Sequence, residues 1–266
     1  MKAPERQLKY SSFLHRLRSA PARILLLDYD GTLAPFTADR GHAFPYSGVP
    51  ALLVRIMAEG TRVALISGRP ARELVLLSGI HPHPEIWGSH GLERLKPDGS
   101  YEVGALSHQH QAALRLAAKA LRADGLERQM ELKPGGIAVH WRGLNARDAA
   151  DINTRVRRLW RPLLTDYSLT LLEFDGGLEI RVPGRDKGDA VQTILSESGR
   201  DAAVACLGDD PTDEDAFRAL KGRGLTVLVR PQPRPTAADI WLQPPQELIR
   251  FLEEWIRASR GKRDAD

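Results

Sequence analysis

The stretch ILLLDYDGT, residues 24–32, decides the fold of this chain. Its four consecutive apolar residues indicate a strand buried on both faces, as in a parallel sheet. Open α/β sheets bind ligands beyond the carboxyl ends of their strands, and there the sequence places Asp28 and Asp30. Side chains two residues apart on a strand point to the same side, so both carboxylates are expected to face one site.

Two neighbouring carboxylates repel each other and require a cation or a proton. Oxygen ligands of this kind suit Mg²⁺. One aspartate can then act as a nucleophile while the other moves protons. Taken by itself, an Asp-Gly turn after a strand explains the pair equally well.

Predicted strands and helices alternate in two parts of the sequence, which are separated by a segment with a different pattern. The core strands are expected at 24–27, 63–66, 85–95, 202–207 and 225–229. The core helices are expected at 1–20, 48–59, 187–198, 212–221 and 245–258. The block between them combines helices 106–123 and 146–162 with two β-hairpins, Met130–Arg142 and Leu169–Val182. The prediction is an α/β fold, with a parallel Rossmann-like core (1–102 plus 183–266) that has helices on both faces, and an inserted α+β domain (103–182).

Composition narrows the possible partners. The 38 Lys and Arg against 34 Asp and Glu leave a net charge of +4, mixed along the chain, which suits a small anion and does not indicate nucleic acid. The apolar runs are too short for a membrane span, and no apolar signal core is present. Cys206 has no possible disulfide partner in the chain. We expect a cytoplasmic protein, a monomer or weak homo-oligomer, without nucleic-acid or membrane partners.

Further polar residues follow other predicted strands or begin helices. Ser67 and Gly68 precede a helix expected to begin at Pro70, and free amides at such a start bind phosphate. Lys187 lies in a first helical turn, where a cation opposes the helix dipole unless an anion accompanies it. Ser67 as a loop residue and Lys187 as a surface residue are the ordinary alternatives.

Acidic residues cluster after the predicted strand 202–207. Thr212 and Asp215 resemble a capping box, which explains part of the cluster. Asp209 precedes that helix, so metal ligation explains it better than capping does. Together, these strand ends supply the charges that phosphoryl transfer requires.

Four strings carry a family resemblance. They are LDYDGTLAP (27–35), ISGRP (66–70), SHGLE (89–93) and GDDPTDEDAF (208–217). With Lys187, their order is similar to that of the haloacid dehalogenase (HAD) superfamily, and the fuller strings resemble trehalose-6-phosphate phosphatases. The resemblance implies a HAD-like core whose insert is the αββαββ cap, or lid, domain.

The resemblance also implies the roles of individual residues. Asp28 would be the nucleophile and Asp30 the acid/base. Mg²⁺ would be held by Asp28, the Asp30 carbonyl and Asp209. The implied phosphate contacts are Asp28, Asp30, Gly31, Ser67, Gly68 and Lys187.

Alternation in the two hairpins predicts one apolar and one mixed-charge face for the insert. A solvated face is the commoner outcome of such alternation. The family resemblance instead implies sugar contacts from that face, joined by the loop before the insert. These are Glu131, Lys133, Arg142, Glu179, His90 and Gly91.

The function expected is Mg²⁺-dependent hydrolysis of trehalose 6-phosphate to trehalose and phosphate through an aspartyl-phosphate, in trehalose biosynthesis. A sister phosphatase acting on sucrose phosphate or a mannosyl phosphate would carry the same core motifs. A non-catalytic sugar-phosphate sensor is a third possibility, although it would be expected to lack Asp28, Asp30 or Lys187, and all three are present.

Overall fold

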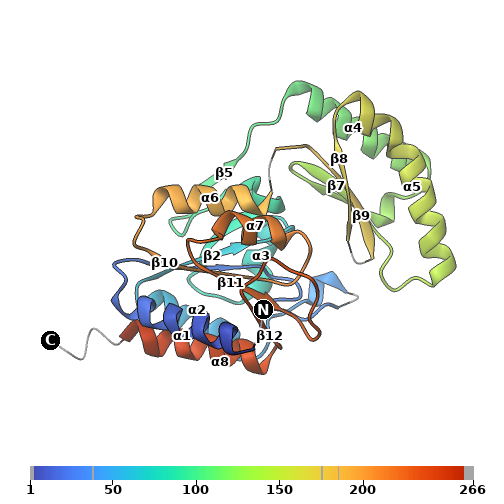
Figure 1. The fold of residues 1–266 in the computed structure, drawn as a ribbon. Helices are drawn as coiled ribbons and strands as arrows, with labels where there is room; N and C mark the ends of the chain where they lie inside the picture. Colours follow the sequence, from blue (N-terminus) through green and yellow to red (C-terminus); the bar gives the residue numbers. More distant parts are fainter. Residues whose placement is uncertain (1–2, 38, 175, 185, 261–266) are drawn as a thin grey trace. The chain divides into compact units, whose positions relative to one another are not determined.

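Residues 3–37, 39–174, 176–184 and 186–260 are described by a computed structural model. The chain divides into a core unit, Met1–Glu102 with Asp186–Asp266, and an inserted unit, Val103–Arg185. Figure 1 shows the ribbon coloured along the sequence, with the helices and strands of both units labelled. No described helix is both long enough and apolar enough to cross a membrane.

A sheet of eight strands forms the middle of the core unit, in the order β12-β11-β10-β1-β2-β3-β4-β5. The strands are β1 Arg23–Leu27, β2 Thr61–Ile66, β3 Glu85–Gly88, β4 Glu93–Leu95, β5 Tyr101–Val103, β10 Ala203–Gly208, β11 Leu225–Val229 and β12 Ile240–Leu242. β1 pairs in parallel with β10 and with β2, and Leu27 lies opposite Leu207 and Leu65. The carboxyl ends of these three strands therefore meet at one edge of the sheet.

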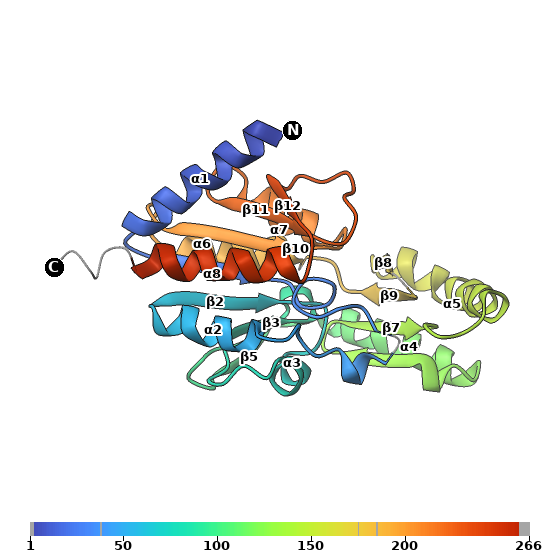
Figure 2. The same ribbon diagram turned by 90° about the horizontal axis from the view of Figure 1, so that it is seen from below.

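Helices cover both faces of this sheet. They are α1 Ala3–Ser19, α2 Val49–Ala58, α3 Ala71–Ser78, α6 Lys187–Glu197, α7 Asp213–Leu220 and α8 Gln246–Arg260. Leu25 and Leu27 of β1 pack in the core formed with α1, α2, α3 and α8, whereas Ile24 and Leu26 pack in the core formed with α6 and α7. Figure 1 shows α6 and α7 on one face with α1, α2 and α8 on the other, and Figure 2 shows α8 beside α1. The predicted parallel α/β core with helices on both faces is confirmed.

The prediction of a single strand over 85–95 is wrong. β3 and β4 are antiparallel and are separated by the short 3₁₀ turn η2, Ser89–Gly91. Ser89, His90 and Gly91 all have positive φ, of 49°, 57° and 97°, and this left-handed backbone reverses the chain. The short strands β5 and β12 were not predicted.

The inserted unit packs two helices on one sheet. Its elements are α4 His108–Ala123, β6 Met130–Lys133, β7 Gly136–His140, α5 Ala146–Asp166, β8 Thr170–Phe174 and β9 Gly177–Arg181. The sheet order is β6-β7-β9-β8 and its pairs are antiparallel. Ile137, Val139, Leu178 and Ile180 pack against the helices, as the alternation predicted. The end of helix α5 was predicted at Pro162, but the helix continues past it to Asp166. Proline removes only one backbone donor from the helix, and Leu163, the next residue, is buried in the core of the inserted unit.

Candidate active site

Asp28 and Lys187 form the centre of the site. Asp28 directly follows β1, and its amide donates to the carbonyl of Leu207 on β10 at 2.9 Å. Lys187 is the first residue of α6, and its Nζ donates to Asp28 Oδ1 and to Asp213 Oδ1, both at 2.7 Å. All three side chains are buried. Two carboxylates therefore compensate a lysine placed at the unfavourable end of a helix dipole.

Asp213 was not among the residues predicted to form the site. Its Oδ2 accepts hydrogen bonds from the amides of Asp209, at 3.0 Å, and Asp210, at 2.9 Å. The predicted capping box is wrong, because Thr212 makes no side-chain cap bond and Asp215 pairs with Arg218. The density of acids after Gly208 was the available signal, but helix capping explained Asp213 without invoking Lys187.

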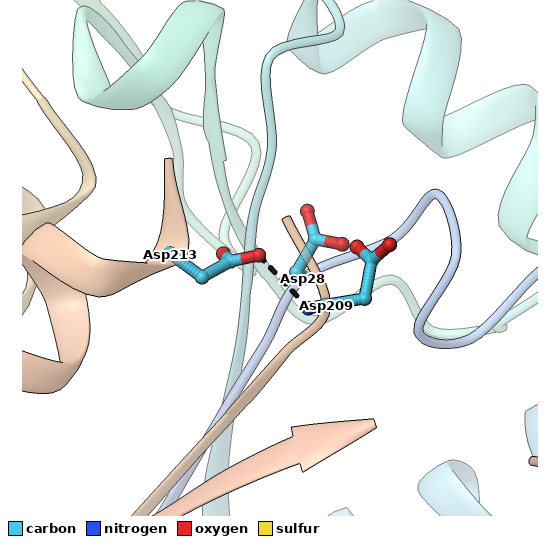
Figure 3. A group of neighbouring side chains, drawn as sticks. All are labelled: Asp28, Asp209 and Asp213. Carbon is cyan, nitrogen blue, oxygen red and sulfur yellow. Dashed lines mark hydrogen bonds between the residues drawn. The ribbon is translucent and has the colours of Figure 1, made fainter. Parts of the chain in front are cut away.

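Three buried carboxylates converge from two strand ends and a helix start. Oxygens of Asp28, Asp209 and Asp213 lie within 4.8 Å of one another (Figure 3). Gly31 permits this approach, because a Cβ there would lie 2.2 Å from Asp209 Oδ2. Its φ of +83° also favours glycine. The DYDGT turn therefore contributes a surface against which the Asp209 carboxylate packs.

The charge of this cluster is incompletely balanced. Within the described residues, no hydrogen-bond donor reaches Asp28 Oδ2 or Asp209 Oδ1, although both atoms are buried. Burial raises the pKa of Asp28 to about 7; the Lys187 ammonium opposes this rise and the Asp213 carboxylate adds to it. Burial, with Asp28 and Asp213, also raises the pKa of Asp209 well above its ordinary value. A cation with oxygen ligands fits this donor set, because it would compensate the charges that one lysine leaves over.

Asp30 does not join this cluster through its side chain. Arg69 holds both of its carboxylate oxygens, with Nε 2.6 Å from Oδ2 and Nη2 2.7 Å from Oδ1. Arg69 is buried and also contacts Glu73 and the carbonyl of Arg40. The expectation that both aspartates face one way assumed a continuing strand, whereas β1 ends at Leu27.

Ser67, Gly68 and His90 come together beside the end of β2. The Ser67 amide donates to the Trp87 carbonyl at 2.9 Å, and its Oγ accepts from the Arg69 amide at 3.2 Å. The His90 ring lies over Gly68, since a Cβ on Gly68 would be 2.7 Å from His90 Cε1 and Nε2. Helix α3 begins after Pro70, which is its N-cap and not its first helical residue as predicted.

Gly91 continues this turn toward the start of α6. A Cβ added to Gly91 would lie 3.0 Å from the carbonyl oxygen of Asp186, the residue before Lys187. The glycine thus allows the loop after β3 to approach the helix that carries the lysine.

The mixed-charge residues of the inserted unit form pairs on one face of its sheet. Lys133 Nζ donates to Glu179 Oε2 at 2.6 Å, and both side chains are about 95% buried, at 6% and 5% exposure. His140 Nε2 lies 2.7 Å from Glu131 Oε2. His140 was not selected as a site residue, although the alternation places it on this face. Arg142, beyond β7, packs against Gly176, where a Cβ would lie 2.2 Å from its Cγ.

A parallel core with a lysine–carboxylate cluster beyond its strand ends, interrupted by an α+β insert, defines a HAD-type phosphatase fold. The family model described as trehalose-phosphatase matches residues 26–245. The chain belongs to the trehalose-phosphatase family, whose members are phosphoric monoester hydrolases.

Individual relatives agree with this assignment. The chain is 32% identical over 248 residues to the trehalose-phosphate phosphatase of Mycobacterium avium, covering 86% of this chain and 61% of that protein. It is 29% identical to the probable trehalose-phosphate phosphatase H of Arabidopsis thaliana, covering 95% and 77%. The solved trehalose-6-phosphate phosphatase of Aspergillus fumigatus superposes with a TM-score of 0.66 at 25% identity, covering 93% of this chain and 97% of that one.

Proposed function

We propose that this protein hydrolyses trehalose 6-phosphate to trehalose and phosphate, with Asp28 as the nucleophile. Family membership supports the substrate. The geometry of Asp28 supports the mechanism, because Lys187 fixes one carboxylate oxygen and no donor among the described residues reaches the other. That second oxygen is the one available to attack phosphorus.

The reaction proceeds in two steps. Asp28 forms a bond to phosphorus while the bond to the sugar oxygen breaks, and Asp30 donates a proton to that oxygen. Asp30 then takes a proton from the water that attacks the aspartyl-phosphate, which releases phosphate and restores Asp28. Arg69 donates one hydrogen bond to each Asp30 oxygen, which leaves one lone pair on each oxygen to carry the proton.

Asp28, Asp209 and the Asp30 carbonyl would hold Mg²⁺. When bound, the cation offsets the repulsion between the Asp28 carboxylate and the phosphate. Lys187 shares this task from α6, and Ser67, Gly68 and Gly31 provide further phosphate contacts.

The sugar is bound by the polar face of the inserted unit. Sugar hydroxyls both donate and accept hydrogen bonds, so a face with ammonium, carboxylate and imidazole groups suits them. Glu131, Lys133, Arg142 and Glu179 are the proposed contacts, with His90 and Gly91 from the core unit.

The decisive experiment measures phosphate release from a sugar-phosphate panel with and without Mg²⁺. We expect wild type to prefer trehalose 6-phosphate, and Asp28→Asn to lose at least about 10³-fold in kcat. Asp39→Asn, at an exposed aspartate, serves as the control. Near-wild-type turnover by Asp28→Asn would refute the mechanism.

The same panel separates the alternative functions. Preference for sucrose phosphate or a mannosyl phosphate would indicate a sister phosphatase. Tight binding without turnover by wild type would indicate a sensor.

A further inference from the structure

The segment 231–237, between β11 and β12, supplies an arginine to the loop that carries Asp209. Arg234 Nε donates to the carbonyl of Asp209 at 3.1 Å, and Nη2 donates to the carbonyl of Asp210 at 2.8 Å. Its Nη1 pairs with Glu214 on α7 at 2.5 Å. The side chain is 17% exposed. No role was predicted for this segment from the sequence.

The loop that carries Asp209 is held by hydrogen bonds to both its backbone amides and its backbone carbonyls. Asp213 accepts the amides of Asp209 and Asp210, while Arg234 donates to their carbonyls. Arg230 Nη1 adds a second donor to the Asp209 carbonyl at 3.1 Å. Bonds on both sides of the Asp209 Cα restrict its two backbone dihedrals and therefore the direction of its side chain.

This restraint keeps the Asp209 carboxylate close to two other carboxylates. The Asp209 carboxylate lies beside Asp28 and Asp213, and like charges in a buried site repel. A loop free to move would relieve this repulsion by carrying Asp209 away. A guanidinium fork that spans two carbonyls opposes that movement, and Asp209 Oδ1 stays oriented without a donor among the described residues.

The arginine is itself held in place. Glu214 accepts from Arg234, from Thr236 Oγ1 at 2.8 Å and from the Ala237 amide at 2.8 Å. Pro233 and Pro235 flank the arginine and restrict its backbone. The segment is therefore attached to α7, the helix that also carries Asp213.

We propose that Arg234 is a positioning residue for the Asp209 carboxylate and that it sets the affinity of this site for a divalent cation. The inference rests on the proposed function only where that function assigns the cation to Asp28 and Asp209. It is independent of the sugar.

The test measures Mn²⁺ binding to the metal-free protein by electron paramagnetic resonance, without substrate. Arg234→Ala is expected to raise the Mn²⁺ dissociation constant about 10-fold or more, as loss of groups that orient a ligand commonly does. Arg234→Lys should restore part of the affinity, because an ammonium keeps the positive charge but lacks the planar fork of donors with which Arg234 bonds the two carbonyls and Glu214. Arg218→Ala, which removes an exposed arginine on α7 that pairs with Asp215, should leave the dissociation constant unchanged.

Activity assays give a second readout. The Mg²⁺ concentration for half-maximal activity should rise by the same factor in Arg234→Ala, while kcat at saturating Mg²⁺ stays within about 3-fold of wild type. Glu214→Gln, which loosens Arg234 without removing it, should give a smaller rise and tests the idea if Arg234→Ala does not fold.

Two outcomes would overturn the inference. One is an unchanged Mn²⁺ dissociation constant in a folded Arg234 variant, even with a lower melting temperature. The other is an equal effect of Arg218→Ala. Failure of the proposed function looks different, because wild type would then release no phosphate while Arg234→Ala still bound Mn²⁺ weakly.

Discussion

The two polar clusters of this protein balance their charges differently. In the core unit, three buried carboxylates share one lysine, and two of their oxygens lack a donor among the described residues. On the sheet of the inserted unit, Lys133 contacts Glu179 and His140 contacts Glu131, so the cationic or basic groups and the carboxylates are matched in pairs. The first cluster is suited to a cation, whereas the second is suited to neutral hydroxyls that can replace either member of a pair.

Stability alone explains neither cluster. Burial of a salt bridge carries a desolvation cost, and replacing such pairs by apolar residues is often neutral or stabilising. Crowded carboxylates without enough counter-charge are costlier still. Both arrangements therefore support the proposed ligands, a cation for the first cluster and a sugar for the second.

The largest effect expected in this comparison is on the core cluster, from Gly31→Ala. Its Cβ would collide with the Asp209 carboxylate, so divalent-cation affinity should fall about 10- to 100-fold. Calorimetric titration of Mg²⁺ into the metal-free protein measures this change.

Gly48→Ala is the matched control for that variant. Gly48 also has a positive φ, +86°, but open space surrounds its Cβ position. It should cost about 1–2 kcal/mol of stability through backbone strain and leave cation affinity unchanged. Equal affinity losses in both variants would mean that strain, and not contact with Asp209, matters.

A smaller effect is expected from Glu179→Gln in the inserted unit. Weakening one charged hydrogen bond to the sugar should raise KM for trehalose 6-phosphate about 10-fold. Hydrolysis of p-nitrophenyl phosphate, which has no sugar, should change less than about 3-fold. Glu173→Gln, which weakens the exposed pair with Arg157 in the same unit, is the control. Similar losses on both substrates would argue against sugar recognition by this face.

The smallest effect concerns pH and the metal-free protein. The pKa of Asp28 is raised to about 7 in the folded state from 3.8, so its protonated form favours folding. This contribution is fully present below pH 4 and is lost as pH rises toward 7. Relative to Asp28→Asn, wild type in EDTA should therefore lose stability as the pH rises from 5 to 7.5.

Urea unfolding at the two pH values measures this difference. Asp98→Asn is the control, since hydrogen bonds from Ser100 lower the pKa of Asp98 and its contribution is constant above pH 5. A wild-type curve that runs parallel to Asp28→Asn across this range would contradict the assignment of a raised pKa to Asp28.

Most of the fold could be predicted because its signals are local. Each apolar run and each helical period is formed by residues that are close together in the sequence. These patterns predicted β1, β2, β10 and β11 with their helices. The elements that were missed, β5 and β12, have three residues each and carry too little pattern. The reversal at Ser89–Gly91 was missed because positive φ at serine and histidine is not encoded by a turn signature.

The candidate site was predictable to the extent that topology places strand ends together. Asp28, Asp209 and Lys187 were inferred because they follow strands or begin a helix at one edge of a parallel sheet. The roles of Asp213, Arg69 and Arg234 were not, because each has an ordinary local explanation as a capping, motif or loop residue. Only their contacts reveal a second use.

By itself, then, the sequence determined the main core strands and helices, the fold class and the family. The tertiary structure alone decided which charges meet. Asp28 and Lys187 are 159 residues apart, and their 2.7 Å contact exists because β1 and β10 are neighbours and α6 begins beside them. Side-chain pairing depends on distances between elements, which local periodicity does not encode, whereas the elements themselves follow from residues close in the chain.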